Sequence, residues 1–334
     1  MRSAAPPPPP PLSPYGTLHG TLFQYSTFPS LVAFESSCSS SISSTDDAAA
    51  AATVNLPKNK CILLGGLSDG LLPVPYTKQL ENACHERGWS LVQPVISSSY
   101  LGFGNGDLTR DTDEISALMR YLRHHRSAEN FAFVGHSTGC QNSIHFLKNG
   151  DPDMVARTKS VALQAPVSDR EHAMMEPNYK ENIRIARQMK DTGDGDEMMP
   201  RSAFWAPITA SRFLSLQDVG GDDDFFSSDL SDEDMTKRLG HIGKWGVENS
   251  AYLLAAFSGA DEYVPSSVDK DLLLERMCRA MNGSEGKREN CERSVAKPLM
   301  LETGNHNLSE GQDDGDRFVA AFAEQLEFAV PSSS

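Results

Sequence analysis

The chain has 334 residues, enough for one large α/β domain with an insertion or for two ordinary domains. Its formal charge is −15, from 30 basic and 45 acidic residues, and no cluster of Lys or Arg interrupts this balance. Because a phosphate backbone would be repelled, we expect no nucleic-acid partner. No apolar run approaches the roughly 18 residues of a membrane helix, so we expect no membrane span.

The N-terminal segment, residues 1–17, contains six consecutive prolines and is predicted to be a disordered tail. It lacks the apolar centre of a secretory signal, and the six cysteines are scattered without a CxxC pair. These features favour a cytoplasmic protein with reduced thiols. A plastid or mitochondrial transit peptide stays an alternative, although Arg2 is the only Lys or Arg before Lys58. We expect neither a metal site nor a cofactor.

The chain opens with two β-favouring stretches, 18–25 and 31–35, which predict an antiparallel hairpin. A Ser- and Ala-rich surface loop is expected at 36–55. From Lys60 onward, short apolar strands alternate with amphipathic helices; the strands are predicted at 61–64, 89–95, 131–134 and 160–165, and the helices at 75–87, 108–125 and 141–148. This alternation is typical of a parallel sheet with right-handed crossovers.

The alternation stops after residue 165 and resumes at 252–258 with a strand, which is followed by a helix at 272–281, a strand at 298–302 and a closing helix at 316–328. Residues of about 170–245 are therefore predicted to form a cap over one edge of the sheet of a single domain at 18–330. Within the cap, Phe204 and Trp205 are expected to line a substrate pocket. Residues 218–234 are rich in Asp and Glu and contain no Lys or Arg, so we expect them to stay solvated and mobile, gating entry to the pocket. A surface loop without a role in binding is the alternative.

The segment Gly135-His136-Ser137-Thr138-Gly139 matches G-x-S-x-G, the pattern of a nucleophilic serine on a sharp strand-to-helix turn. Its glycines keep side chains out of the crowded space around the turn. A simple glycine-rich turn is the alternative reading. The apolar strand before the motif and the helix after it favour Ser137 as a nucleophile.

A serine hydroxyl needs a base, and the base needs a group that orients it. His306 alone among the histidines lies beyond the strand at 252–258, in a loop that can reach back to the sheet edge. Asp261 follows that strand and is the preferred acid. Asp169 follows the earlier strand at 160–165 and is the second candidate, but it also fits the first turn of a helix capped by Ser168 and Glu171.

The negative charge that develops on a carbonyl oxygen needs hydrogen-bond donors that are fixed beforehand. One candidate donor is the backbone N–H of Thr138, and the other is the N–H of Leu67, or next Gly66, in the loop after the first parallel strand. Ser99 and Tyr100 follow the strand at 89–95 and are candidates for the substrate pocket; an ordinary turn is equally compatible with them.

Four segments in order resemble a plant and fungal family of poorly characterised α/β-hydrolases (DUF1749-type), which includes fungal esterases of fusarinine-type siderophores; they are Gly65–Leu72, Ser97–Gly102, Gly135–Gln141 and Gln164–Arg170. The resemblance covers roughly residues 18–328. It implies an intracellular serine esterase of the α/β-hydrolase fold, with a triad on Ser137, Asp261 and His306. The Pro-rich tail and the acidic residues near Asp222 depart from the family pattern.

The residues and the resemblance together predict a serine hydrolase of the α/β-hydrolase fold, with a mostly parallel sheet flanked by helices. The expected reaction is cleavage of a small-molecule carboxylic ester through an acyl-enzyme intermediate. An amidase or peptidase would use the same triad, so it stays open. A binding protein without catalysis on the same fold is the alternative from another class.

Overall fold

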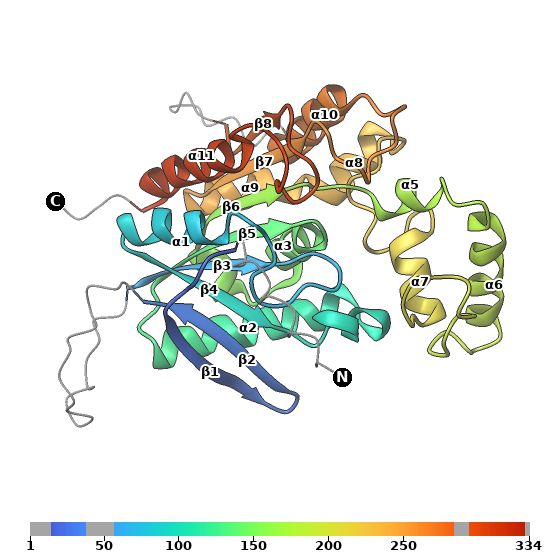
Figure 1. The fold of residues 1–334 in the computed structure, drawn as a ribbon, viewed down its shortest axis with the longest axis horizontal. Coiled ribbons are helices and arrows are strands. Elements are labelled where there is room, and N and C mark those ends of the chain that lie inside the picture. The colour runs from blue at the N-terminus through green and yellow to red at the C-terminus, as the bar shows by residue number, and fades with distance from the viewer. Residues whose placement is uncertain (1–14, 38–56, 284–293, 331–334) are drawn as a thin grey trace, which may run out of the picture.

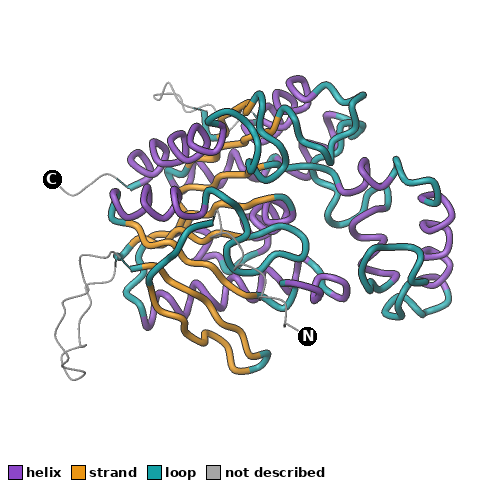
Figure 2. Tube along the Cα trace, in the orientation of Figure 1, coloured by secondary structure: helices purple, strands orange, loops and turns teal. Residues whose placement is uncertain are grey.

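The structure is a computed structural model that describes residues 15–37, 57–283 and 294–330. Most of the predicted Pro-rich tail and of the loop at 36–55 lies outside these residues. One sheet runs through the molecule in the strand order β1-β2-β4-β3-β5-β6-β7-β8. Helices pack on both of its faces (Figures 1 and 2).

The strands of this sheet are β1 (Gly20–Thr27), β2 (Ser30–Ser36), β3 (Asn59–Leu64), β4 (Trp89–Val95), β5 (Asn130–His136), β6 (Thr158–Gln164), β7 (Tyr252–Ser258) and β8 (Ala296–Leu301). The predicted hairpin is confirmed, because β1 pairs with β2 in antiparallel register. β2 is also antiparallel to β4. The pairings from β4 through β3, β5, β6 and β7 to β8 are all parallel.

Alternate residues of the central strands enter two separate cores, because successive side chains of a strand point to opposite faces. In β3, Cys61 packs with α1 (Thr77–Glu86) and α11 (Asp314–Ala329). Its neighbour Ile62 packs on the other face, which is covered by α2 (Leu108–His125), α3 (Thr138–Asn149), α9 (His241–Asn249) and α10 (Lys270–Asn282). Both faces of the central strands are buried by helices, and these strands accordingly consist largely of apolar residues.

Three helices of the predicted cap form a lobe beside the sheet, at the right of Figure 1. They are α5 (Asp169–Ala173), α6 (Tyr179–Asp191) and α7 (Ala210–Gln217). The lobe has a small core of its own, in which Ile183 of α6 and Phe213 of α7 pack together. Phe103 joins this core from η2 (Tyr100–Asn105), a short 3₁₀ helix of the main body. The fold therefore carries a cap insertion, as the sequence predicts.

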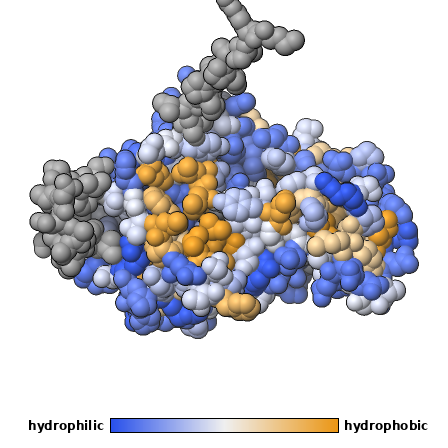
Figure 3. Space-filling model, turned by 60° about the horizontal axis from the view of Figure 1, so that its bottom comes forward, coloured by the Kyte–Doolittle hydropathy of each residue, from blue (hydrophilic) through white to orange (hydrophobic). Residues whose placement is uncertain are grey.

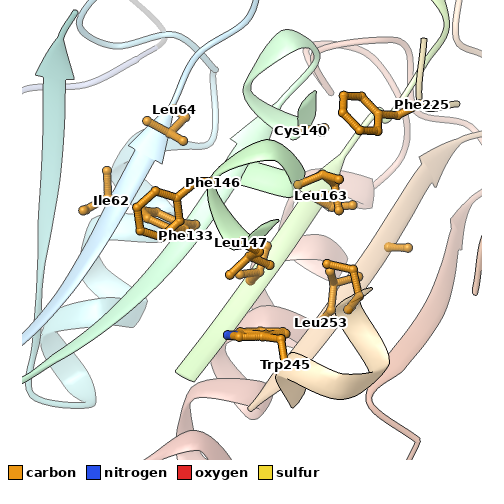
Figure 4. Packing of buried hydrophobic residues seen from close by; sticks show 14 of the residues in the cluster. Ile62, Leu64, Phe133, Cys140, Phe146, Leu147, Leu163, Phe225, Trp245 and Leu253 are labelled. Carbon is orange, nitrogen blue, oxygen red and sulfur yellow. The ribbon is translucent and has the colours of Figure 1, made fainter. Parts of the chain in front are cut away.

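Residues beyond 217 leave the lobe and return to the main core. Phe225 and Phe226 are buried with Trp245 of α9 in the same core as Leu163 and Leu253 of the central strands (Figure 4). Helix α8 (Asp232–Leu239) buries Met235 and Leu239 in that core. The lobe is thus smaller than the segment 170–245.

The expectation that residues 218–234 are solvated is wrong for residues 223–227, which are buried, whereas residues 231–234 are exposed as expected. Asp223 and Asp224 are only 3% and 2% exposed. Asp223 pairs with Arg212 of α7 at 2.7 Å, and Asp224 pairs with Arg170 of α5 at 3.0 Å. Arg170 also binds Asp229, and the Ser168 and Ser227 hydroxyls lie 2.6 Å apart. Because the compensating arginines come from the lobe, Asp223 and Asp224 can be buried, and their ion pairs join the lobe to the body.

Most of the surface in Figure 3 is hydrophilic, and hydrophobic residues gather in one large area left of centre and in a smaller area toward the right. Such a surface agrees with a chain in which 22% of residues are charged. Within the described ranges, no helix has the length and apolar character to cross a membrane.

Candidate active site

The carboxyl ends of the parallel strands meet at one edge of the sheet, and the loops that leave them carry the predicted site residues. His136 at the end of β5 lies beside Gln164 at the end of β6, and Ser258 at the end of β7 lies beside Leu301 at the end of β8. Residues that are far apart in the sequence are therefore brought together at this edge.

Ser137 occupies a sharp turn between β5 and α3, with a φ of 52° and a ψ of −121°. A non-glycine residue rarely adopts a positive φ, and such a conformation costs about 1–3 kcal/mol. The turn leaves no room for side chains at its flanks: a Cβ on Gly135 would lie 2.3 Å from the Gly139 carbonyl oxygen, and one on Gly139 would lie 2.3 Å from that of Leu64. This is the geometry that the G-x-S-x-G pattern predicts.

His306 and Asp261 lie together at the ends of the loops that follow β8 and β7. The His306 Nδ1 atom is 2.8 Å from Asp261 Oδ2. Asp261 is 3% exposed and His306 is 9% exposed, so water competes little for this bond. The His306 backbone N–H also donates to the Glu262 carboxylate at 2.9 Å, and the Tyr263 ring packs edge-on against the imidazole. The histidine loop is therefore fixed from several sides.

Gln164 and His136, whose roles the sequence did not indicate, form a hydrogen-bonded group at this edge. Gln164 is fully buried, and its amide nitrogen donates to the His306 carbonyl oxygen at 2.9 Å. Its amide oxygen accepts from the Tyr76 hydroxyl and lies 2.7 Å from His136 Nδ1. Because that oxygen can only accept, His136 carries its proton on Nδ1. Burial, helped by repulsion from His306, lowers the pKa of His136 to about 3, so His136 stays neutral.

Asp169, the second candidate for the acid, lies at the start of α5, and the His306 Nδ1 atom binds Asp261 instead. Its carboxylate accepts from the Gln141 side chain at 3.2 Å. Burial raises the pKa of Asp169 to about 6, with a further contribution from Asp223. The predicted N-terminal capping of helix α5 is present in part. The Ser168 hydroxyl accepts from the Glu171 N–H, but the Glu171 carboxylate binds Ser228 instead of returning to the Ser168 backbone.

The loop after β3 passes directly in front of Ser137, since a Cβ on Gly66 would lie 2.9 Å from the Ser137 Cβ. The Gly66 N–H donates to Asp69 Oδ2 at 2.7 Å, so the suggestion that Gly66 donates to a substrate oxygen is wrong. Among the described residues, no acceptor binds the Leu67 N–H. Thr138 is the first residue of α3, and its N–H therefore has no acceptor within the helix.

A cavity of about 920 Å³ opens in front of Ser137 and His306. Its floor includes Gly66 and Leu67 from the loop after β3, and its far wall comes from the lobe, with Tyr179, Phe204 and Trp205. The predicted pocket residues Phe204 and Trp205 thus face the same cavity as Ser137. In the described part of the chain, no three His, Cys, Asp or Glu side chains are grouped so as to hold a metal ion.

The placement of Ser99 and Tyr100 in the substrate pocket is wrong. The Ser99 hydroxyl accepts from the Ile96 N–H in a turn, and Tyr100 begins η2 with its side chain 56% exposed. The Tyr100 ring packs over Gly70, where an added Cβ would lie 2.3 Å from it. The loop after β3 lies between these residues and the cavity, because β4 is one strand further from β5 than β3 is.

Comparison with known proteins identifies the family. Residues 12–318 match the family model described as "Protein of unknown function (DUF1749)". The chain belongs to this family. It is 38% identical over 241 residues to a UPF0613 protein of Schizosaccharomyces pombe; this alignment covers 67% of this chain and 75% of the relative. It is 32% identical over 311 residues to the fusarinine C esterase sidJ of Aspergillus fumigatus; this alignment covers 79% of this chain and 83% of the relative.

Solved structures confirm the predicted fold. The siderophore hydrolase EstB from Aspergillus fumigatus superposes with a TM-score of 0.73 at 28% identity, over 95% of this chain and 99% of that chain. An α/β-hydrolase fold protein of unknown function superposes with a TM-score of 0.61 at 17% identity, over 93% of this chain and 96% of that chain. This DUF1749 member has the α/β-hydrolase fold.

Proposed function

We propose that this DUF1749 protein is a serine hydrolase that cleaves carboxylic esters of small molecules through an acyl-enzyme intermediate. One observation carries the proposal: His306, which is bound by the buried Asp261, and Ser137 on its strained turn line the same cavity. The arrangement matches the roles of acid, base and nucleophile in serine hydrolases. Relatives named as esterases and a structural neighbour named as a siderophore hydrolase support an ester as the substrate.

In the proposed reaction each group has one step. The Ser137 Oγ attacks the ester carbonyl while His306 Nε2 takes its proton, and Asp261 holds the opposite ring nitrogen protonated and stabilises the imidazolium. The N–H groups of Thr138 and Leu67 bind the oxygen that becomes negative. His306 then returns the proton to the leaving alcohol. Water, activated by the same histidine, hydrolyses the acyl-Ser137 ester and frees the acid.

A siderophore-type ester is one candidate substrate, because two fungal relatives bear such names. The cavity of about 920 Å³ agrees with a large ester, since pockets for small molecules span about 300–1,000 Å³. An amidase or peptidase would use the same groups. Parallel assays of an ester and an amide with the same acyl group separate these two reactions.

The proposal is tested by labelling the full chain with a fluorophosphonate, which reacts with activated serines. We expect one labelled peptide, with the phosphonyl group on Ser137, and loss of ester turnover in proportion to labelling. Heat-denatured protein is the control and takes up no label. A native protein that neither reacts nor turns over esters would refute the hydrolase and favour a binding protein.

We expect Phe204→Ala with Trp205→Ala to raise the KM for bulky esters while small activated esters are unaffected. Both rings line the cavity, and each aromatic contact contributes about 0.5–1.5 kcal/mol, so the KM should rise about tenfold. Steady-state kinetics across a series of acyl sizes measures this. Because Phe204 also packs on Phe213 inside the lobe, Trp205→Ala alone is the milder matched variant: Trp205 is 57% exposed, and its removal leaves the Phe204–Phe213 contact in place. Unchanged kinetics across all sizes would remove the lobe from substrate binding.

We also expect cationic esters to be preferred over uncharged isosteres. Among the described residues that line the cavity, Asp69, Asp169, Glu176 and Glu262 are acidic and none is Lys or Arg. The measurement compares kcat/KM for butyrylcholine and for 3,3-dimethylbutyl butyrate, and the preference should fall as salt rises. Glu176→Gln should reduce it about threefold. Glu324→Gln, an equal charge change on the outer side of α11, is the control, and an equal effect of both variants would contradict a role for the lining.

A further inference from the structure

A second, much smaller cavity of about 30 Å³ lies behind the loop after β3. Its lining includes Gly66 and Leu67 of that loop, Thr138 and Asn142 of α3, and Arg212 of α7 in the lobe; the segment after β4, with Ser98 and Ser99, completes the wall. Asp111 of α2 is also part of its wall. The cavity therefore lies where the body, the lobe and the proposed oxyanion-binding loop meet.

Three buried polar atoms of lining residues have no partner among the described residues: Thr138 Oγ1, Asn142 Oδ1 and Arg212 Nε. Their residues are 6%, 4% and 4% exposed. Leaving a buried polar group without a hydrogen bond costs about 1–3 kcal/mol, and native proteins rarely accept this cost three times in one place. Arg212 Nε can only donate, Asn142 Oδ1 can only accept, and the Thr138 hydroxyl can do both.

A water molecule matches this set, because it can accept from Arg212, donate to Asn142 and exchange a further bond with Thr138. A buried water needs about 10–15 Å³ of such space and two to four polar partners. The cavity therefore has room for one or two waters and is too small for an organic ligand. The Asp111 carboxylate in its wall disfavours an anion.

We propose that one or two ordered waters occupy this cavity and hold the Thr138 backbone in position for oxyanion binding, bridging it to the lobe through Arg212. The proposal rests on the proposed hydrolase function. Thr138 and Asn142 are four residues apart on one face of α3, so one water can contact both side chains. Arg212 is anchored by Asp223 at 2.7 Å, which fixes the lobe end of the bridge.

In this arrangement the Thr138 side chain, Asn142 and Arg212 are positioning residues. They act through the Thr138 N–H, which binds charge only as the transition state forms. A shift of that donor therefore lowers kcat and leaves KM nearly unchanged. Removing an oxyanion donor outright costs about 100- to 1,000-fold in kcat, so loss of the water that positions it should cost about tenfold.

The first test is a crystal structure of the full-length wild-type protein at a resolution that shows ordered solvent. We expect density in the cavity within hydrogen-bond distance of Thr138 Oγ1, Asn142 Oδ1 and Arg212 Nε. A well-ordered cavity without density would overturn the proposal, whatever the protein's activity. The outcome is therefore separate from that of the hydrolase assignment, which is judged by wild-type turnover of a neutral activated ester.

The second test compares Thr138→Val, which removes the hydroxyl and keeps the size and the backbone N–H, with Thr138→Ser, which keeps the hydroxyl. The valine variant should lose about tenfold in kcat with KM within twofold, and the serine variant should regain most of it. Thr158→Val is the matched control, because Thr158 is also a buried threonine but lies at the start of β6, at the end of the strand remote from the site, where its hydroxyl donates to the Met154 carbonyl oxygen. Equal kcat values for Thr138→Val and Thr158→Val would overturn the positioning role. If Thr138→Val does not fold, Asn142→Leu takes its place with the same expected loss.

Discussion

Replacing Ser137 by alanine is expected to lower the turnover of an activated ester by about 10⁶-fold, the loss seen when the serine of a comparable triad is removed. This corresponds to about 8 kcal/mol of transition-state stabilisation. The fold should persist, because alanine keeps the Cβ that contacts the loop after β3 at Gly66. Initial rates at saturating substrate, together with fluorophosphonate labelling, measure the effect.

Ser116→Ala is the control for this experiment, since Ser116 is a buried serine of α2 whose hydroxyl binds the Thr112 carbonyl oxygen. It should keep both labelling and turnover. Circular dichroism and thermal unfolding establish that each variant is folded. Labelling that persists in folded Ser137→Ala protein would show that another residue is the nucleophile.

The elements around the sheet could be predicted from the sequence because each has a local cause. The strand before Ser137 is a short apolar run that enters both cores, and the helices beside it repeat apolar residues at helical spacing. The chain order of serine, acid and histidine also follows from the sheet, because each residue must leave a strand at the same edge. The predicted strand and helix positions therefore agree with the structure to within a few residues.

The burial of Asp223 and Asp224 could not be predicted because it depends on partners that are not their neighbours in sequence. Asp224 and Asp223 are neutralised by Arg170 and Arg212, which lie 54 and 11 residues away. Composition alone indicated solvation, whereas the fold supplies two arginines from the lobe. A Phe-Phe pair between the acidic residues was the local signal of burial, since Phe225 and Phe226 both enter the main core.

The placement of Ser99 and Tyr100 failed for a topological reason. The sequence shows that they follow a strand, and it does not show the order of the strands in the sheet. β4 lies beyond β3, so the loop after β3 separates them from Ser137. Gln164 was missed although it carried a signal: it is a polar residue directly after the apolar run Val161–Leu163 of β6, and burial requires such a residue to be hydrogen-bonded.

The sequence left two candidates for the acid, Asp261 and Asp169. Comparing the kcat of Asp261→Asn with that of Asp169→Asn decides between them. Asp261→Asn should lower kcat by about 10⁴-fold. An amide at this position can donate its N–H to His306 Nδ1, which leaves the proton on Nε2, and the imidazole can then no longer accept the proton of Ser137. The protein should stay folded, because asparagine has the same shape.

Asp169→Asn should keep kcat within about tenfold of wild type, because Asp169 binds Gln141 and makes no bond to His306. This substitution should instead change how the free energy of unfolding depends on pH. The pKa of Asp169 is raised to about 6 by burial, so the folded wild type holds the proton more tightly than the unfolded chain and loses stability as the pH rises from about 4 to 7. Asparagine has no proton to lose, so the difference in unfolding free energy should shift in favour of Asp169→Asn over that pH range. Urea titrations at pH 5 and pH 7.5 measure it. If instead Asp169→Asn abolished turnover and Asp261→Asn retained it, the acid would come from the loop after β6.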